Sequence, residues 1–190
     1  MQGVYRVRHG SQEFLETFVA APGPMGWRYF GRLHDPDSGR QIAVVDHVVD
    51  LDARLVRFRW TEEAGPRVEA FPQGDGIQVW IQEPAGERSQ LIAGAEVIWS
   101  ASPSSLLVAA RLIETSESAE VMGVRLVPPF LPEPVLVRLG WRRSRTVAAA
   151  SGEVSSAEMD VEVDGWSTRA LMRLDMLLRA DDWFELVGSP

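Results

Sequence analysis

The sequence contains no cysteine, which excludes disulfides, thiolate nucleophiles and thiolate metal sites. It has only three histidines, His9, His34 and His47, and no two of them stand at H-x-x-x-H or H-E-x-x-H spacing. A zinc site would have to combine His34, His47 and a nearby carboxylate such as Asp35 or Asp46. Because the expected strand pairing keeps these two histidines apart, we predict neither a metal site nor a bound cofactor.

Lysine and asparagine are also absent, and all 19 Lys or Arg residues are arginine. A GC-rich genome that disfavours AT-rich codons accounts for this bias, and selection for bidentate guanidinium contacts is the alternative. The net charge is -8 and the pI is about 4.9. This acidic balance disfavours non-specific binding to nucleic acid or to an anionic membrane.

Long hydrophobic runs are missing as well: no window approaches the roughly 18 consecutive apolar residues of a membrane span. The first eight residues, MQGVYRVR, alternate as in a strand and lack the apolar core of a signal peptide. We therefore expect a soluble, cytoplasmic protein with no membrane span. The alternative is a chain from which a leader has been removed.

Motifs for common chemistries do not occur. The chain has no G-x-S-x-G, no G-x-G-x-x-G and no G-x-x-x-x-G-K-[ST], so nucleophile elbows and phosphate-cradling loops are not indicated. The dense segment around Asp46 and His47 is not typical of an acid–base pair, because neighbouring strand residues point to opposite faces. Seven tryptophans are spread along the chain, which favours core and rim positions over an aromatic platform.

Short alternating segments separated by turn residues fill most of the sequence. With strands about every 8–12 residues, the pattern predicts a mainly β protein: a sandwich, barrel or roll. At 190 residues we expect one domain, residues 1–190. The predicted strands are residues 2–9, 12–21, 27–35, 40–50, 54–62, 67–71, 76–83, 90–99, 119–127, 135–142, 145–150, 157–164, 167–174 and 182–187.

A single helix is predicted, at about residues 103–113. Ser102 is a suitable N-cap, and Pro103 suits the first helical position. An apolar stripe, which we expect to cover the sheet, follows helical spacing: Leu106, Leu107, Ala110 and Ile113. The later segment 128–134 is too rich in proline to pair inside a sheet, and it predicts a rigid loop with an exposed or half-exposed tip at Phe130-Leu131.

The strands at 27–35 and 40–50 flank the turn Pro36-Asp37-Ser38-Gly39. Pairing them places Tyr29 opposite Asp46 and Trp27 opposite Val48. Neither face of this sheet is cleanly polar, so we expect it to be covered on both sides or to line a cavity that contains charge. One face then carries the candidate ligand-binding residues Trp27, Tyr29, Val44, Asp46, Val48, Arg57 and Arg59.

Asp46 has two interpretations. In the first, a buried Asp–Arg–Tyr cluster satisfies its charge and fixes the strand register. In the second, Asp46 is a polar anchor in an otherwise apolar cavity.

The chain resembles bacterial spiral β-roll proteins, namely a glycolipid-binding family and a related family of unknown function. The resemblance is carried by Gly26-Trp27-Arg28-Tyr29, by Val45-Asp46-His47-Val48-Val49-Asp50 with Arg54-Leu55-Val56-Arg57, by the helix at 102–113, and near the end by Ala150-Ser151-Gly152-Glu153, Met159-Asp160-Val161-Glu162-Val163 and Leu177-Leu178-Arg179-Ala180-Asp181. Both families are similar in architecture to the periplasmic carriers of lipoproteins. The resemblance implies one antiparallel sheet curled around a central helix, with an apolar interior for a lipid tail. The chain departs from such carriers because it shows neither a leader nor a lipobox cysteine.

These observations favour non-enzymatic binding of a small apolar or amphipathic ligand, such as a lipid or glycolipid, between the curled sheet and the helix. One alternative is a structural or protein-interaction module with a filled core. A second alternative is a hydrolase or isomerase that uses Asp46, His47 and Tyr29.

Overall fold

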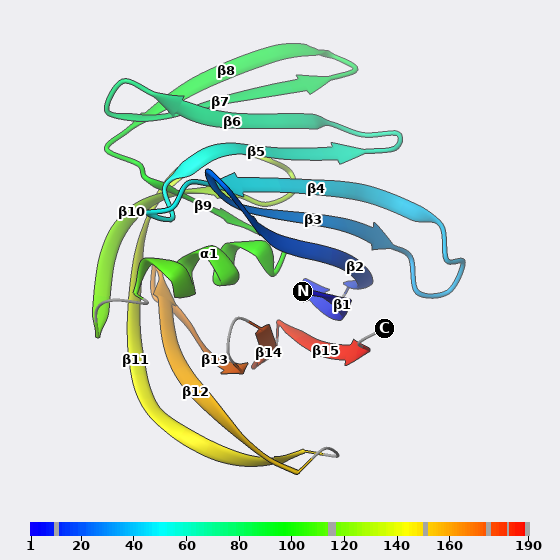
Figure 1. Ribbon diagram of the computed structural model, residues 1–190. Helices are drawn as coiled ribbons and strands as arrows, with labels where there is room; N and C mark the ends of the chain where they lie inside the picture. The colour runs from blue at the N-terminus through cyan, green and yellow to red at the C-terminus, as the bar shows by residue number, and fades with distance from the viewer. Residues whose placement is uncertain (10–11, 114–116, 150–151, 174–175, 182, 189–190) are drawn as a thin grey trace.

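The computed structural model describes residues 1–9, 12–113, 117–149, 152–173, 176–181 and 183–188. Its elements, in chain order, are β1 Gln2–His9, β2 Gln12–Gly23, β3 Gly26–His34, β4 Gln41–Val49, β5 Leu55–Glu62, β6 Arg67–Gln73, β7 Gly76–Glu83, β8 Gly86–Ala93, β9 Val97–Ser100, α1 Ser104–Leu112, β10 Ser118–Leu126, β11 Glu133–Ala149, β12 Gly152–Val163, β13 Trp166–Arg173, β14 Met176–Ala180 and β15 Phe184–Gly188 (Figure 1). In the described part of the chain, no helix is long and apolar enough to cross a membrane.

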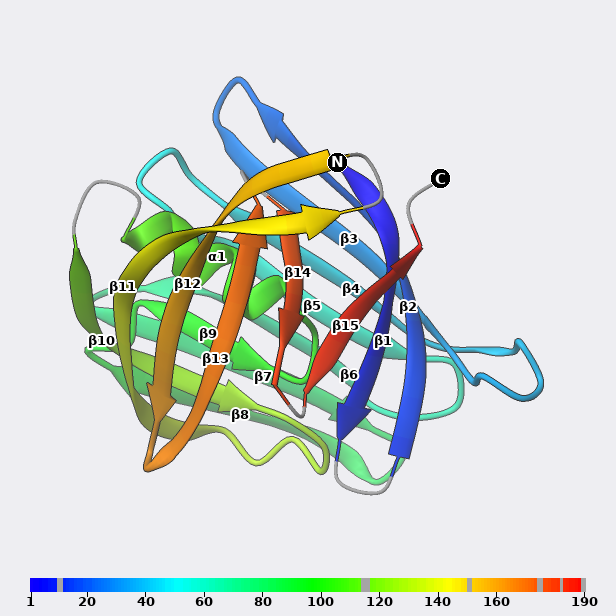
Figure 2. The same ribbon diagram turned by 90° about the horizontal axis from the view of Figure 1, so that it is seen from below.

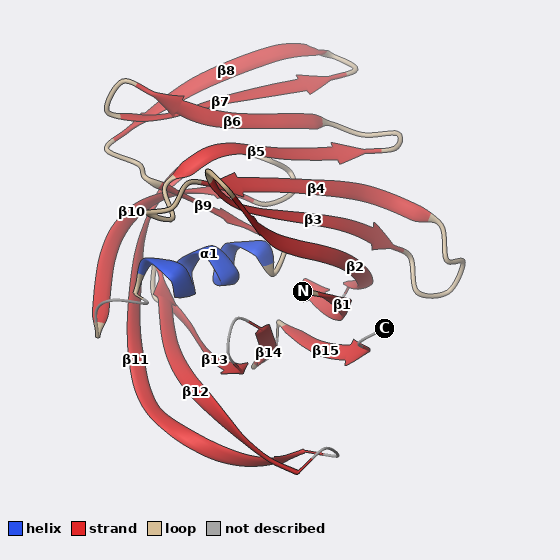
Figure 3. Ribbon diagram, viewed as in Figure 1, coloured by secondary structure: helices blue, strands red, loops and turns tan. Residues whose placement is uncertain are grey.

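The strands of the described residues all belong to one sheet, in the order β8-β7-β6-β5-β4-β3-β2-β1-β15-β14-β13-β12-β11-β10-β9. The sheet curls around α1 without closing into a barrel, so the predicted class is confirmed: mainly β, with one curled sheet and one helix (Figures 1 and 3). One pairing is not antiparallel. Strands β9 and β10 run parallel because α1 carries the chain from the end of one strand to the start of the next.

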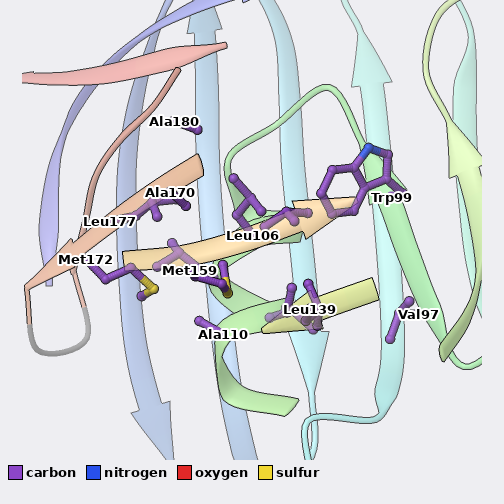
Figure 4. Close-up of a cluster of buried hydrophobic side chains, with 14 of the residues drawn as sticks. Val97, Trp99, Leu106, Ala110, Leu139, Met159, Ala170, Met172, Leu177 and Ala180 are labelled. Atoms are coloured by element: carbon purple, nitrogen blue, oxygen red, sulfur yellow. The ribbon is translucent and has the colours of Figure 1, made fainter. Parts of the chain in front are cut away.

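The helix lies inside the roll, between the layer of β3–β5 and the layer of β11–β13 (Figures 1 and 2). Every residue from Ser104 to Ala110 is buried. Figure 4 shows Leu106 and Ala110 among Met159 of β12 and Leu177 of β14. The space between helix and sheet, where we expected a ligand cavity, is therefore occupied by core side chains.

A second core lies on the other side of β9 and β10. The inner face of β4–β8 packs there against Ile98, Val124 and Leu126. The segment before β11 covers part of this core: Phe130 is buried, contrary to the prediction, and its ring lies 5.5 Å from that of Trp60. Leu131 is exposed, as predicted. The sheet thus overlaps itself, with β9 and β10 enclosed between two apolar layers.

Several predicted boundaries were wrong. The segment 90–99 is two strands, because Gly94 adopts a positive φ of 71° and turns the chain between β8 and β9. The segments 135–142 and 145–150 form the single strand β11, whose irregularity is a shift of register between Trp141 and Ser144. Strand β14 was not predicted. The predicted ends at 150, 174 and 182 lie outside the described residues.

The helix begins one residue later than predicted: Pro103, and not Ser102, is its N-cap, and Ser102 Oγ accepts a hydrogen bond from the backbone N–H of Ser104 at 3.2 Å.

Candidate functional site

The register between β3 and β4 differs from the predicted one. Trp27 pairs with Val49, Tyr29 with His47, and Phe30 with Asp46. The cause is an irregularity between Leu33 and His34, next to the turn, which shifts all later pairs by one residue. A one-residue shift exchanges the faces of a strand, so Asp46 points away from Trp27 and Tyr29.

The seven candidate residues therefore do not form one site. Trp27 and Tyr29 lie on the inner face of the sheet, whereas the other five lie on its outer face: Val44, Asp46, Val48, Arg57 and Arg59. The hydrolase or isomerase alternative needs Asp46, His47 and Tyr29 on one face, and the same shift of register separates Asp46 from the other two. Tyr29 and His47 are cross-strand neighbours inside the roll, and Asp46 is outside it.

On the outer face Asp46 is held by two arginines. Arg28 Nε and Arg57 Nη2 each donate a hydrogen bond of 2.7 Å to one of its carboxylate oxygens. The side chain of Asp46 is only 10% exposed, while those of Arg28 and Arg57 are 56% and 37% exposed. Two arginines thus satisfy the charge of Asp46, as the first interpretation of this residue expected, but Tyr29 is not part of the cluster. The cluster links the neighbouring strands β3, β4 and β5.

The inner face carries a buried carboxyl group that sequence reasoning missed. Glu16 of β2 is fully buried, and its Oε1 accepts hydrogen bonds from Tyr29 Oη at 2.7 Å and from Ser102 Oγ at 2.8 Å. Gly31 makes room for it, because a Cβ at Gly31 would lie 2.2 Å from Glu16 Oε1. Burial raises the pKa of Glu16 to about 7, although both hydrogen bonds act in the opposite direction. The alternation of β2 with Phe18 and Ala20 was the sequence signal for its inward position.

His47 lies near the same end of the helix. Its Nδ1 and Ser104 Oγ are 3.3 Å apart, and its ring contacts Phe58 edge-on at 5.4 Å. Burial lowers the pKa of His47 to about 4. Within the described residues, His47 Nε2 has no hydrogen-bond partner, so no carboxylate orients the imidazole as in a catalytic triad. Glu16 and His47 are core polar groups that connect the sheet to the start of α1.

An apolar cavity lies elsewhere, at the end of the roll where β1 and β3 end and β2 and β4 begin. Its volume is about 340 Å³. Two cross-strand pairs line it, Val7 with Phe14 and Leu33 with Ala43, together with Trp60. We call this space the mouth cavity; its remaining lining residues are His9, Gln12, Arg40, Ile42, Glu62, Glu63, Ala64, Gly65, Ala101 and Pro128. None of the seven candidate residues lines it.

A second cavity of about 290 Å³ adjoins the first, since both are lined by His9 and Ala101. Three tryptophans from distant parts of the chain meet there. The ring centroid of Trp99 lies 5.3 Å from that of Trp183 and 6.2 Å from that of Trp166, and the rings of Trp166 and Trp183 are 5.7 Å apart. We call this space the tryptophan cavity; its other lining residues are Arg8, Ser100, Arg125, Val127 and Val163. Trp99 and Trp183 occupy core positions and Trp166 a rim position, and the sequence did not indicate that the three meet.

Among the described residues, no group of three or more His, Asp or Glu side chains is arranged to hold a metal ion.

Comparisons with known proteins bear on the fold. No family model matches the chain, and no curated protein shows significant sequence similarity to it. A solved structure with the same overall arrangement is the β-barrel-like protein of domain of unknown function DUF1849 from Brucella abortus. It aligns with a TM-score of 0.57 over 99% of this chain and 94% of that chain, at 8% sequence identity. This similarity shows the fold alone. It supports a β-rich protein of unknown function, and membership of a glycolipid-binding family stays a prediction.

Proposed function

We propose that this protein binds a small apolar or amphipathic ligand, such as a lipid, in the mouth cavity. The observation that carries the proposal is the character of this cavity. Its inner wall is built of aliphatic and aromatic side chains, and charged residues such as Arg40 and Glu63 lie among its lining residues. Small-molecule sites share this combination of apolar walls and a few polar groups, and a volume of 340 Å³ lies within their usual range of about 300–1,000 Å³.

The location differs from the one that the sequence suggested. The interface between α1 and the sheet is filled, so the ligand site moves to the end of the roll. Both Trp27 and Tyr29 then act as core residues: Trp27 packs under the guanidinium of Arg111, 4.4 Å from its ring centroid, and Tyr29 binds Glu16. A cytoplasmic location of the protein stays a prediction.

The test compares ligand binding with the cavity open and blocked. Native mass spectrometry of the purified protein and thermal shifts across a panel of fatty acids, fatty alcohols and phospholipids should reveal a bound apolar molecule. Ala64→Trp places a large side chain at the mouth cavity and should abolish the shift. The matched control is Ala85→Trp, an exposed alanine that also precedes a glycine near a strand end and does not line the cavity. Protein that is always empty and never stabilised by the panel refutes the proposal.

The filled core around α1 favours one other candidate, a protein-interaction module. Strand β8 is an edge of the sheet, and its residues from Gly86 to Leu91 are exposed. In that case Leu91→Arg should abolish self-association or partner binding measured by light scattering, while the lipid panel has no effect.

A further inference from the structure

The tryptophan cavity differs in charge from the protein around it. The chain carries a net charge of -8, yet the described residues that line this cavity include Arg8, His9 and Arg125 and no acidic residue. Each arginine also has a carboxylate beside it: Arg8 Nε lies 3.6 Å from Glu13, and Arg125 pairs with Glu133. A guanidinium has five N–H donors, so one carboxylate partner leaves others for a ligand.

The aromatic rings extend the apolar surface of the mouth cavity toward these arginines. Trp99 and Trp183 are buried, whereas Trp166 is 43% exposed. The two cavities share His9 and Ala101 as lining residues, so the apolar space at Phe14 adjoins a space lined by arginine and tryptophan side chains.

We propose that the two adjoining cavities form one binding path and that its ligand is an anionic amphiphile. Its carboxylate or phosphate head group lies in the tryptophan cavity beside Arg8 and Arg125, and its alkyl chain lies in the mouth cavity. The inference rests on the proposed function, because it assigns the class of ligand and its orientation at the same site. Arginine suits this role because its planar fork of donors matches the oxygens of carboxylate and phosphate.

The experiment compares two ligands with the same ten-carbon chain, decanoate and 1-decanol, by calorimetric titration below their aggregation limits. We expect decanoate to bind about tenfold more tightly, as a charge-assisted hydrogen bond would provide. Sodium chloride should weaken the binding of decanoate only. The double variant Arg8→Gln/Arg125→Gln should remove the preference for decanoate. Its unchanged affinity for decanol shows that it is folded.

The matched control is Arg67→Gln, an exposed strand arginine paired with Glu69 that is not among the lining residues of either cavity, which should leave both affinities unchanged. Equal affinities for decanoate and decanol, both lost in Ala64→Trp, overturn the anionic preference while the proposed function stands. A preference for decanoate that survives in the double variant overturns the role of the two arginines. Displacement of decanoate by an equal concentration of inorganic phosphate indicates a plain anion site and also overturns the proposal. If neither ten-carbon ligand binds, the proposed function itself fails.

Discussion

Glu16→Gln is predicted to change how the stability of the protein depends on pH. The folded-state pKa of Glu16 is about 7, against an ordinary value of 4.5, because the carboxyl is buried. The folded protein therefore holds this proton more tightly than the unfolded chain does. The resulting stabilisation is complete below pH 4.5 and is lost as the pH rises toward 7, and its size is about 3 kcal/mol.

His47 has the opposite dependence. Its folded-state pKa is about 4, against an ordinary value of 6.5, so its contribution is complete above pH 6.5 and is lost as the pH falls toward 4. The size is again about 3 kcal/mol. Between pH 4.5 and 6.5 a rise in pH weakens the stabilisation from Glu16 and strengthens that from His47, so the two changes oppose each other. Tyr29 and Tyr5, which neighbour Glu16, do not titrate in this range because burial raises the pKa of both phenols.

The assay is urea unfolding followed by tryptophan fluorescence between pH 4.5 and 8, at constant ionic strength. The free energy of unfolding of the wild type relative to Glu16→Gln should rise by about 3 kcal/mol as the pH falls from 8 to 4.5, or about 6–12 °C in Tm for a chain of this size. Glu87→Gln, at an exposed glutamate of β8, corrects for the loss of one negative charge. If the difference between wild type and Glu16→Gln is independent of pH, Glu16 is not buried as described.

Three further changes test other parts of the structure. Gly31→Ala should lower the free energy of unfolding by about 1–3 kcal/mol, because the new Cβ collides with Glu16, and it should cost less in a Glu16→Ala background, as a double-mutant cycle in urea would show. Asp46→Ala should lower the free energy of unfolding by about 1–2 kcal/mol, a value reduced because Arg28 and Arg57 are partly exposed. The variant should bind decanoate as tightly as the wild type does. A stable variant that no longer binds decanoate would show that Asp46 is a ligand anchor. Phe130→Ala should destabilise by about 3–5 kcal/mol in the same unfolding assay, since its ring is buried against Trp60, and a change below 1 kcal/mol would mean that the loop does not cover the core.

The architecture was accessible from the sequence because strand alternation and turn residues are local signals. Most strand positions and the helix near Ser104 follow from them. The parallel pairing of β9 with β10 was not accessible, since it depends on where α1 packs in the finished roll.

The prediction of the candidate site was wrong because of one irregularity in the strand pairing. The irregularity beside His34 has no composition signal, yet it moves Asp46 from the inner to the outer face. Contacts between distant segments could not be predicted either, because they too leave no local signal in the sequence. Trp99 meets Trp166 and Trp183 only when the sheet curls, and Glu16 accepts a hydrogen bond from Ser102, 86 residues away.

The central claim is that a ligand lies at the end of the roll and not between helix and sheet. A crystal structure with decanoate brominated at its terminal carbon tests this most directly, because the anomalous signal of bromine locates the end of the alkyl chain. We predict a bromine peak among Phe14, Leu33 and Trp60. A peak between α1 and the sheet, or no peak in either cavity at saturating ligand, would contradict the account.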